Sequence, residues 1–410
     1  MKVLQLCIRV PFPPQDGGSI AMYNMERSLF ENGASVKVLA FNTIKQYVEI
    51  EKLDPDYLKM TKIEGIFLDN RIKPFAALLN LFSGESYHII RFIRRDFDEA
   101  LMKILETEQF DIIQLESLFM IPYLDTINRL SNAPVLLRTH NVEHLIWKRL
   151  ANITTNSLRK WYLNLLANRL KRYETWALNR VDGIIALTPE DKKMILEESP
   201  EVPVFVAPIG VDASEYHPKP LPPGDIIFHI GAMDWIPNQE GIKWFLDQVW
   251  PEIERDYPDV KFRFAGKKMP PGFFNFQSDR IEVKGFIPDA KEYMNEGTIM
   301  IVPLFSGSGM RVKIIEGMAM GRAIVTTPVG MEGIHAVDGK HFLMAQDAAE
   351  FTKQVKLLIE NRELVKSIGA NARAFVEEEF DNKAIGKKIL GFYEEQINPI
   401  TTNQSIIPST

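Results

Sequence analysis

The chain has 410 residues, 46% hydrophobic and 25% charged, which is the balance of a soluble globular protein with two or three domains. The formal net charge of −6 argues against nucleic acid as a partner. No apolar run reaches the ~20 residues that span a bilayer. The single cysteine, Cys7, cannot form an internal disulfide, so a cytoplasmic location is expected.

Short apolar runs alternate with longer amphipathic stretches through the first half of the chain, as in a parallel sheet flanked by helices. The predicted strands are residues 2–10, 35–41, 112–115, 135–139, 183–187 and 204–207. The predicted helices include residues 19–32, 91–107 and 157–179. This alternation predicts a doubly wound α/β domain over residues 1–216.

Two loops of this first domain carry candidate ligand contacts. Gly17 and Gly18 follow the first strand and precede a helix, and His140 follows the strand that ends at residue 139. Ligands of α/β sheets bind at the carboxyl ends of strands. We therefore expect the glycine pair to contact an acceptor or a phosphate, and His140 to contact a reacting sugar or phosphate. A plain turn and a structural histidine are the alternative interpretations.

The second half of the chain repeats the pattern. Four prolines and a glycine in residues 217–224 predict a linker. Strands are expected at residues 226–230, 261–265, 281–284, 299–304 and 323–326, and helices at 238–257, 290–295, 311–320 and 348–361. A second domain over 225–378 follows, then a helix over 379–398 that crosses back to the first domain and a disordered tail over 399–410. Two doubly wound domains joined by a hinge would enclose a cleft between them.

One βαβ unit of the second domain has the features of a diphosphate site. Gly307 and Gly309 lie between a buried strand and a helix that begins near Arg311. The free N–H groups and the dipole of a helix start attract anions, and Arg311 and Lys313 add two positive charges. Glu316, one turn further, offers a carboxylate to the paired hydroxyls of a ribose.

Other strand ends in the second domain are candidate donor contacts. Gly231 follows the first strand and leaves room for a ligand phosphate, while Gly285 and Phe286 end another strand, where backbone groups can hold a base edge. The seven histidines are scattered, and no His or Cys spacing matches that of a metal site. Neither a metal nor a cofactor is expected.

These residues together resemble glycosyltransferase family 4 enzymes of the GT-B fold. The resemblance runs over nearly the whole chain. It rests on the glycine pair, Thr-His-Asn-Val-Glu at 139–143, Gly-Ala-Met-Asp-Trp-Ile-Pro-Asn at 231–238 and Gly-Ser-Gly-Met-Arg-Val-Lys-Ile-Ile-Glu at 307–316. It implies two Rossmann-like domains facing across a cleft and a metal-independent, retaining transfer from a nucleotide-diphosphate sugar to a glycan or lipid-linked acceptor, as in bacterial surface polysaccharide synthesis.

The resemblance also assigns roles to matching residues. Glu316 would hold the donor ribose, and His140 would lie near the reacting carbon. Gly18 would approach the phosphate or the acceptor. Arg311 and Lys313 would neutralise the diphosphate during catalysis. The residues expected to face the donor sugar and phosphates are Ser308, Gly309 and Met310.

Two departures from the family pattern leave other functions open. Ser308 stands where the family usually has a second glutamate, and no basic residue lies between Phe228 and Glu240, where a family Arg–Lys pair is common. A sugar-nucleotide epimerase on the same fold and a catalytically silent sugar-nucleotide binder are the alternatives. Nucleotide release measured with and without acceptors distinguishes all three.

Residues 145–180 carry eight basic side chains and one acidic side chain, Glu174, interleaved with aromatic and leucine residues. A basic amphipathic helix with aromatic residues is typical of proteins that bind anionic membrane surfaces. A core-facing helix with a solvated charged face fits the same pattern. Since lipid-linked acceptors are common in the family, we expect peripheral contact with the inner face of a membrane.

Overall fold

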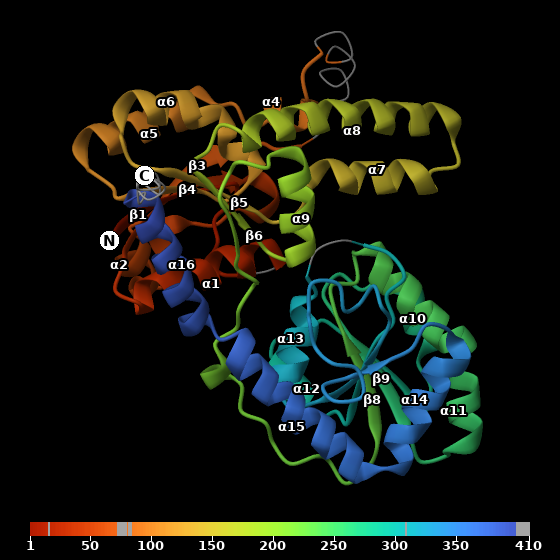
Figure 1. The fold of residues 1–410 in the computed structure, drawn as a ribbon. Coiled ribbons are helices and arrows are strands. Elements are labelled where there is room, and N and C mark those ends of the chain that lie inside the picture. The colour runs from red at the N-terminus through yellow and green to blue at the C-terminus, as the bar shows by residue number, and fades with distance from the viewer. Residues whose placement is uncertain (15–16, 72–79, 81–83, 308–309, 399–410) are drawn as a thin grey trace, which may run out of the picture. The chain divides into compact units, whose positions relative to one another are not determined.

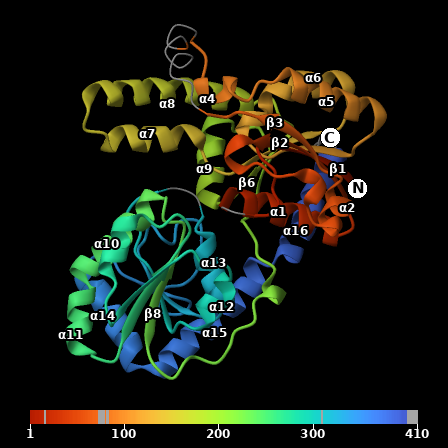
Figure 2. The ribbon, with the colours of Figure 1, turned by 180° about the vertical axis from the view of Figure 1, so that it is seen from behind.

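The computed structural model describes residues 1–14, 17–71, 80, 84–307 and 310–398. The chain forms two compact units, Met1–Ala207 together with the chain from Ile385 onward, and Pro208–Ala384. The described strands of each unit form a parallel sheet, which helices accompany (Figures 1 and 2). The predicted α/β fold class is therefore confirmed.

The described part of the first unit contains a seven-stranded sheet in the order β3-β2-β1-β4-β5-β6-β7. Its strands are β1 (Lys2–Cys7), β2 (Ser35–Thr43), β3 (Glu64–Leu68), β4 (Ile112–Leu115), β5 (Val135–Thr139), β6 (Gly183–Ala186) and β7 (Val204–Val206). Its helices are α1 (Gly17–Glu31), α2 (Pro55–Thr61), α4 (Tyr87–Ile90), α5 (Arg95–Thr107), α6 (Leu124–Leu130), α7 (Glu143–Ile153), α8 (Ser157–Leu178), α9 (Pro189–Glu198) and α16 (Asn382–Ile397).

Alternate side chains of β1 face opposite layers of helices. Leu4 and Leu6 pack in one apolar cluster with side chains of α5, α6 and α8, whereas Val3 and Cys7 pack in a second cluster with side chains of α1, α2 and α16. Because successive side chains of a strand point to opposite faces, a strand that is buried on both sides reads as a continuous apolar run. This explains why β1, β4 and β5 could be recognised in the sequence.

Helix α16 packs in the first unit although it lies near the end of the chain. Ile389, Phe392 and Tyr393 are buried there, and the Phe392 ring stacks on Phe205 of β7 with centroids 5.2 Å apart. A Cβ at Gly386 would lie 2.1 Å from the Ser28 hydroxyl, so the absence of a side chain lets α16 approach α1 closely.

In the second unit, the described residues form a six-stranded sheet in the order β10-β9-β8-β11-β12-β13. The strands are β8 (Ile226–Ile230), β9 (Lys261–Ala265), β10 (Ile281–Gly285), β11 (Ile299–Val302), β12 (Ala323–Thr326) and β13 (Leu343–Met344). The helices are α10 (Ile236–Gln248), α11 (Trp250–Asp256), α12 (Ala290–Asn295), α13 (Val312–Ala319), α14 (Ala348–Glu360) and α15 (Arg362–Glu379).

The single helix expected over residues 238–257 is two helices, α10 and α11. Pro251 lies in the first turn of α11 and has no N–H with which to continue the hydrogen-bond ladder of α10. Val249 between the helices keeps a helical ψ of −50° but has φ −113°. The first helix therefore ends where the proline interrupts the ladder.

We had expected the chain to pass between the two units at the proline-rich segment 217–224. It does not do so. The segment has no helix or strand, but it packs within the second unit: the Lys219 N–H donates to Asn295 at 2.9 Å, and Arg322 donates to the Lys219 carbonyl at 2.9 Å. Arg362 donates to the Pro222 carbonyl. Proline has no backbone N–H but keeps its carbonyl. In this segment, backbone carbonyls accept hydrogen bonds from arginines. The chain passes between the units at residues 207–208 and 384–385 instead.

Candidate active site

Arg311 and Lys313 lie where α13 begins, at the carboxyl end of β11. Arg311 immediately precedes the helix and is buried. Its guanidinium carbon lies 5.4 Å from the centroid of the Trp235 ring, and Lys313 Nζ lies 5.9 Å from the same centroid. The indole thus contacts both cations, a favourable arrangement for positive charge.

The turn after β8 meets the same two cations. Lys313 Nζ donates to Asn238 Oδ1 at 2.5 Å, and Asn238 Nδ2 donates to the Ala232 carbonyl at 2.8 Å. A Cβ at Gly231 would lie 2.7 Å from Asn238 Nδ2 and 2.9 Å from Lys313 Nζ. The structure therefore brings the predicted residues Gly231, Arg311 and Lys313 together, and a side chain at 231 would displace the Asn238 amide and the Lys313 amine.

Positive charge dominates this cluster. Burial and the neighbouring Arg311 lower the pKa of Lys313 to about 7. Burial and Lys313 also hold the pKa of His229 well below its ordinary value, and His229 Nδ1 donates to the Ile301 carbonyl at 2.9 Å. The carboxylate of Glu332 lies 3.9 Å from Arg311, at the outer limit of an ion pair. Bringing an anion to this cluster would relieve the repulsion between the two cations.

Glu316 lies one helical turn beyond Lys313 on α13. Its Oε1 accepts a hydrogen bond from the Tyr216 hydroxyl at 3.1 Å, and Lys291 Nζ lies 4.6 Å from the centroid of the Tyr216 ring. Burial raises the pKa of Glu316, and the Tyr216 hydrogen bond opposes that rise. The carboxylate is thus oriented by Tyr216, a contact that the sequence did not reveal because 100 residues separate the two.

The remaining predicted donor residues are less closely associated with the cations. Met310 is buried. Gly285 ends β10 with a left-handed φ of 63°, and Phe286 after it is 71% exposed. Ser308 and Gly309 lie outside the described residues.

In the first unit, His140 lies at the carboxyl end of β5 beside a buried carboxylate. His140 Nε2 lies 3.0 Å from Glu116 Oε2, and Arg138 Nη1 donates to the same oxygen at 3.1 Å. Arg138 also donates to the Ala21 carbonyl of α1 at 3.0 Å. The helix that begins at Gly17 and Gly18 is thereby tied to the strand that carries His140, so both predicted loops belong to one end of this sheet. One signal in the sequence pointed to Glu116, which is a carboxylate directly after a buried strand.

The segment 145–180 forms a hairpin of α7 and α8, which lie side by side (Figures 1 and 2). Glu174, the one acidic residue of this segment, contacts the start of α7. It is buried and accepts from the backbone N–H groups of Glu143 and His144 at 2.9 and 3.1 Å, and from His144 Nδ1 at 2.7 Å. Glu174 therefore caps α7, whose own N-cap residue provides no side-chain bond.

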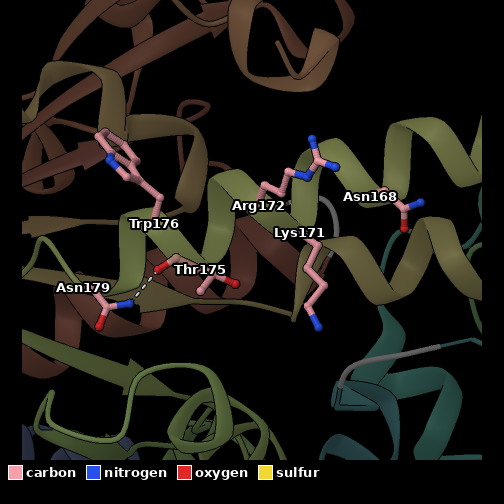
Figure 3. Close-up of a pocket in the computed structure, with 6 residues that line it drawn as sticks. All are labelled: Asn168, Lys171, Arg172, Thr175, Trp176 and Asn179. Atoms are coloured by element: carbon pink, nitrogen blue, oxygen red, sulfur yellow. Dashed lines mark hydrogen bonds between the residues drawn. The ribbon is translucent and has the colours of Figure 1, made fainter. Parts of the chain in front are cut away.

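The aromatic and basic side chains of this hairpin fall into two classes. Trp147 stacks on His88 with centroids 4.1 Å apart, and Lys171 pairs with Glu198 of α9 at 2.7 Å. By contrast, Leu158 and Trp161 are 75% and 57% exposed. A hollow of about 560 Å³ on α8 is lined by Asn168, Lys171, Arg172, Thr175, Trp176 and Asn179, and Lys171 points away from Arg172 and Trp176 (Figure 3).

No helix in the described part of the chain combines the length and the apolar character needed to cross a bilayer.

Comparison with protein families covers most of the chain. Residues 16–215 match the family described as "Glycosyltransferase Family 4", and residues 224–361 match "Glycosyl transferases group 1". The "Uncharacterized 44.6 kDa protein in cps region" of Klebsiella pneumoniae is 21% identical over 405 residues, covering 95% of this chain and 98% of that protein. An uncharacterized glycosyltransferase of Methanocaldococcus jannaschii is 25% identical over 283 residues, covering 66% of this chain and 72% of that protein.

Solved structures share the fold at low sequence identity. Sucrose-phosphate synthase from Thermosynechococcus elongatus has a TM-score of 0.72 at 16% identity, covering 96% of this chain and 99% of that one. TarM has a TM-score of 0.70 at 14% identity with the same coverage. Anabaena HepE in complex with UDP has a TM-score of 0.67 at 14% identity, covering 96% of this chain and all of that one. With the family matches, these neighbours show that the chain is a glycosyltransferase of the GT-B fold and belongs to glycosyltransferase family 4.

Proposed function

We propose that this glycosyltransferase moves a sugar, with retention of configuration, from a nucleotide-diphosphate sugar to a hydroxyl of a glycan or lipid-linked acceptor. The observation that carries the proposal is the cluster of Arg311, Lys313 and Trp235 at a helix start, with Glu316 one turn further on. We place the reaction in bacterial surface polysaccharide synthesis because a relative matching nearly the whole chain is described as lying in a cps region.

The chemistry follows from the two cations. When the bond between the sugar C1 and the diphosphate oxygen breaks, its electron pair goes to that oxygen. Arg311 and Lys313 stabilise the developing charge, and the N-terminus of α13 adds its dipole. The acceptor oxygen bonds to C1 on the face that the diphosphate leaves, and its proton goes to the leaving diphosphate. The cations take the place that a divalent metal holds in other transferases, so no metal is required.

The first unit supplies the acceptor side of the reaction in this proposal. His140 contacts the reacting sugar or the acceptor hydroxyl, and Gly17 and Gly18 bring backbone N–H groups of α1 to the acceptor or to a phosphate. A cavity of about 220 Å³ lies beside the loop that follows β5 and is lined partly by Thr139, Asn141 and His144. Its size suits part of a sugar or a lipid head group.

The tip of the α7–α8 hairpin contacts an anionic membrane in this proposal, which places the enzyme on the inner face of the membrane beside a lipid-linked acceptor. Leu158 and Trp161 are exposed next to Arg159 and Lys160, all in the first two turns of α8. Each basic residue near an anionic surface contributes about 1 kcal/mol, and exposed aromatic residues prefer the interface.

The transfer experiment uses UDP and UDP-glucose as first probes because structural neighbours are described in complex with them. Nucleotide release from UDP-glucose and other sugar nucleotides is measured with and without glycan and lipid-linked acceptors, and the product linkage is read by NMR. Release that depends on an acceptor, with a retained anomeric configuration, supports the proposal. An epimerised sugar nucleotide without acceptor points to an epimerase, and binding without turnover points to a silent binder.

Two matched variants sharpen the experiment. Arg311→Ala removes a proposed donor contact, whereas Arg255→Ala removes an exposed arginine of the same unit that pairs with Asp256. Only the first substitution should abolish acceptor-dependent release.

Co-sedimentation with vesicles tests the membrane contact separately. Wild type should bind phosphatidylserine vesicles at low salt, and Leu158→Ala/Trp161→Ala should reduce binding. Phe30→Ala, which removes an exposed aromatic side chain of α1, should not. Absence of wild-type binding at low salt would refute the contact and favour a soluble acceptor.

A further inference from the structure

A fully buried carboxylate lies beneath the carboxyl ends of β4 and β5. Glu116, directly after β4, is 0% exposed. Its Oε2 accepts from Arg138 Nη1 at 3.1 Å and lies 3.0 Å from His140 Nε2, while its Oε1 accepts from Gln114 and, at 3.4 Å, from Gln5. A buried charge is tolerated only where donors surround it, as they do here.

The contact with Glu116 decides which nitrogen of the imidazole carries the proton. An ionised carboxylate only accepts hydrogen bonds, so Nε2 must be the donor. In the neutral ring Nδ1 is then the unprotonated nitrogen, with a lone pair available to a hydroxyl group. We infer that Glu116 is a positioning residue that fixes the ring and the tautomer of His140, so that Nδ1 is the nitrogen presented to the reacting sugar or acceptor hydroxyl.

The electrostatics of the surrounding groups are consistent with this arrangement. Burial alone would raise the pKa of Glu116, but Arg138 and the hydrogen bonds from His140 and Gln114 outweigh burial and lower it. Burial lowers the pKa of His140, with help from the positive charges of Arg138 and Arg9, while Glu116 opposes the shift. At neutral pH the pair is therefore a carboxylate and a neutral imidazole.

Helix α16 supports the Glu116 carboxylate indirectly, through Gln114. The Tyr393 hydroxyl of α16 donates to Gln114, whose amide in turn donates to Glu116. Glu26 of α1 is a second buried acid, and it accepts from the Tyr57 hydroxyl of α2 at 3.0 Å. Burial raises the pKa of Glu26 well above its ordinary value, the Tyr57 hydrogen bond opposes that rise, and the charge of Glu116 adds to it.

The chemical consequence rests on the proposed function in one respect, that His140 contacts a reactant. A neutral imidazole with Nδ1 open accepts a hydrogen bond from a sugar or acceptor hydroxyl. A ring with the other tautomer would donate there instead, and an imidazolium would add a positive charge. Glu116 thus acts on the reaction only through His140.

The test combines a measurement that needs no substrate with one that does. In ¹⁵N-histidine-labelled wild-type protein, NMR should show His140 protonated at Nε2, with a pKa below 6.5. In Glu116→Gln the ring loses its anionic partner, so the pKa of His140 should lie about one unit below its value in the wild type. Glu26→Gln is the matched control: the same substitution at an equally buried position of the same unit should leave the pKa of His140 unchanged.

The kinetic measurement distinguishes positioning from mere structural support. The acid limb of the kcat/KM profile should move to lower pH in Glu116→Gln, together with a fall in kcat and little change in the KM for the sugar nucleotide. Loss of activity without movement of the limb would mean that Glu116 only stabilises the fold, and would overturn the inference. A wild-type His140 protonated at Nδ1 would overturn it as well.

A protein without transferase activity would still give the NMR result, so failure of the proposed function and failure of this inference are distinguishable. If Glu116→Gln does not fold, Glu116→Asp keeps the charge but withdraws it by one methylene. His140 should then populate both tautomers, and retention of the wild-type tautomer alone would contradict the inference.

Discussion

Lys313 gives the donor site a pH dependence that can be measured. Its pKa is lowered to about 7 by burial and by Arg311, so near neutral pH the free protein holds both the amine and the ammonium form. A bound diphosphate stabilises only the ammonium form. Below pH 7 the lysine is already charged and affinity reaches a plateau. Above pH 7 binding must take up a proton, so affinity falls as the pH rises.

The size of the effect follows from the pKa. With a free-state pKa of about 7 and a much higher bound-state pKa, the dissociation constant should rise about tenfold between pH 6 and pH 8, equivalent to ~1.4 kcal/mol. Titration calorimetry with a sugar nucleotide is the appropriate assay, because a diphosphate esterified at both ends keeps a constant charge over this range. His229 stays neutral there, since burial and Lys313 hold its pKa well below 6.5.

The control is Lys313→Met, which has no titrating group at this position. It should bind more weakly at pH 6 and show a flat pH profile. Repeating the wild-type titration at pH 7.5 in buffers with different ionisation enthalpies should reveal about three-quarters of a proton taken up per ligand bound. A flat wild-type profile, or a slope that survives in Lys313→Met, would refute the reasoning.

Three further predictions concern other residues of the two units. Wild type should bind a ribonucleotide diphosphate more tightly than its 2′-deoxy form by about 1.5–3 kcal/mol, the value of a hydrogen bond to a charged group, and Glu316→Gln should lose most of that preference in calorimetry. A metal chelator should leave the transferase activity unchanged. If the chelator abolished the activity and magnesium restored it, the proposed role of the two cations would be contradicted. Glu174→Gln should lower the free energy of unfolding by about 1–3 kcal/mol in urea denaturation, because it weakens the cap on the N–H groups of Glu143 and His144. Glu198→Gln removes the charge of a half-buried partner of Lys171 and should cost less than that, and equal losses would argue against the cap.

The order of the elements was largely predictable because parallel strands that are buried on both faces read as continuous apolar runs. The ends of β4, β5, β8, β9 and β12 agree with the prediction residue for residue. β3 was missed because it is an edge strand whose Glu64, Gly65 and Phe67 are exposed, so its apolar pattern is weak. β13 has two residues, too few for any periodicity.

The candidate donor site was only partly predictable. Gly231, Arg311 and Lys313 could be identified because glycines and cations at strand ends are recognisable locally. The contacts that orient them were not, since Asn238 lies 75 residues from Lys313 in the chain.

Long-range contacts also decide how the carboxylates act. Tyr216 orients Glu316 across 100 residues, and Tyr393 reaches Gln114 across 279. No local pattern encodes such pairs. For the same reason the sequence gives no sign that Glu174, the one acid among eight basic residues, caps a neighbouring helix.

The central claim is that Arg311 and Lys313 bind the diphosphate of a sugar nucleotide while Glu316 binds its ribose. A crystal structure with a bound sugar nucleotide tests it most directly. We predict phosphate oxygens about 2.7–2.9 Å from Lys313 Nζ and from the Arg311 guanidinium, with a ribose hydroxyl on the Glu316 carboxylate. A sugar nucleotide whose diphosphate contacts neither cation would contradict the account.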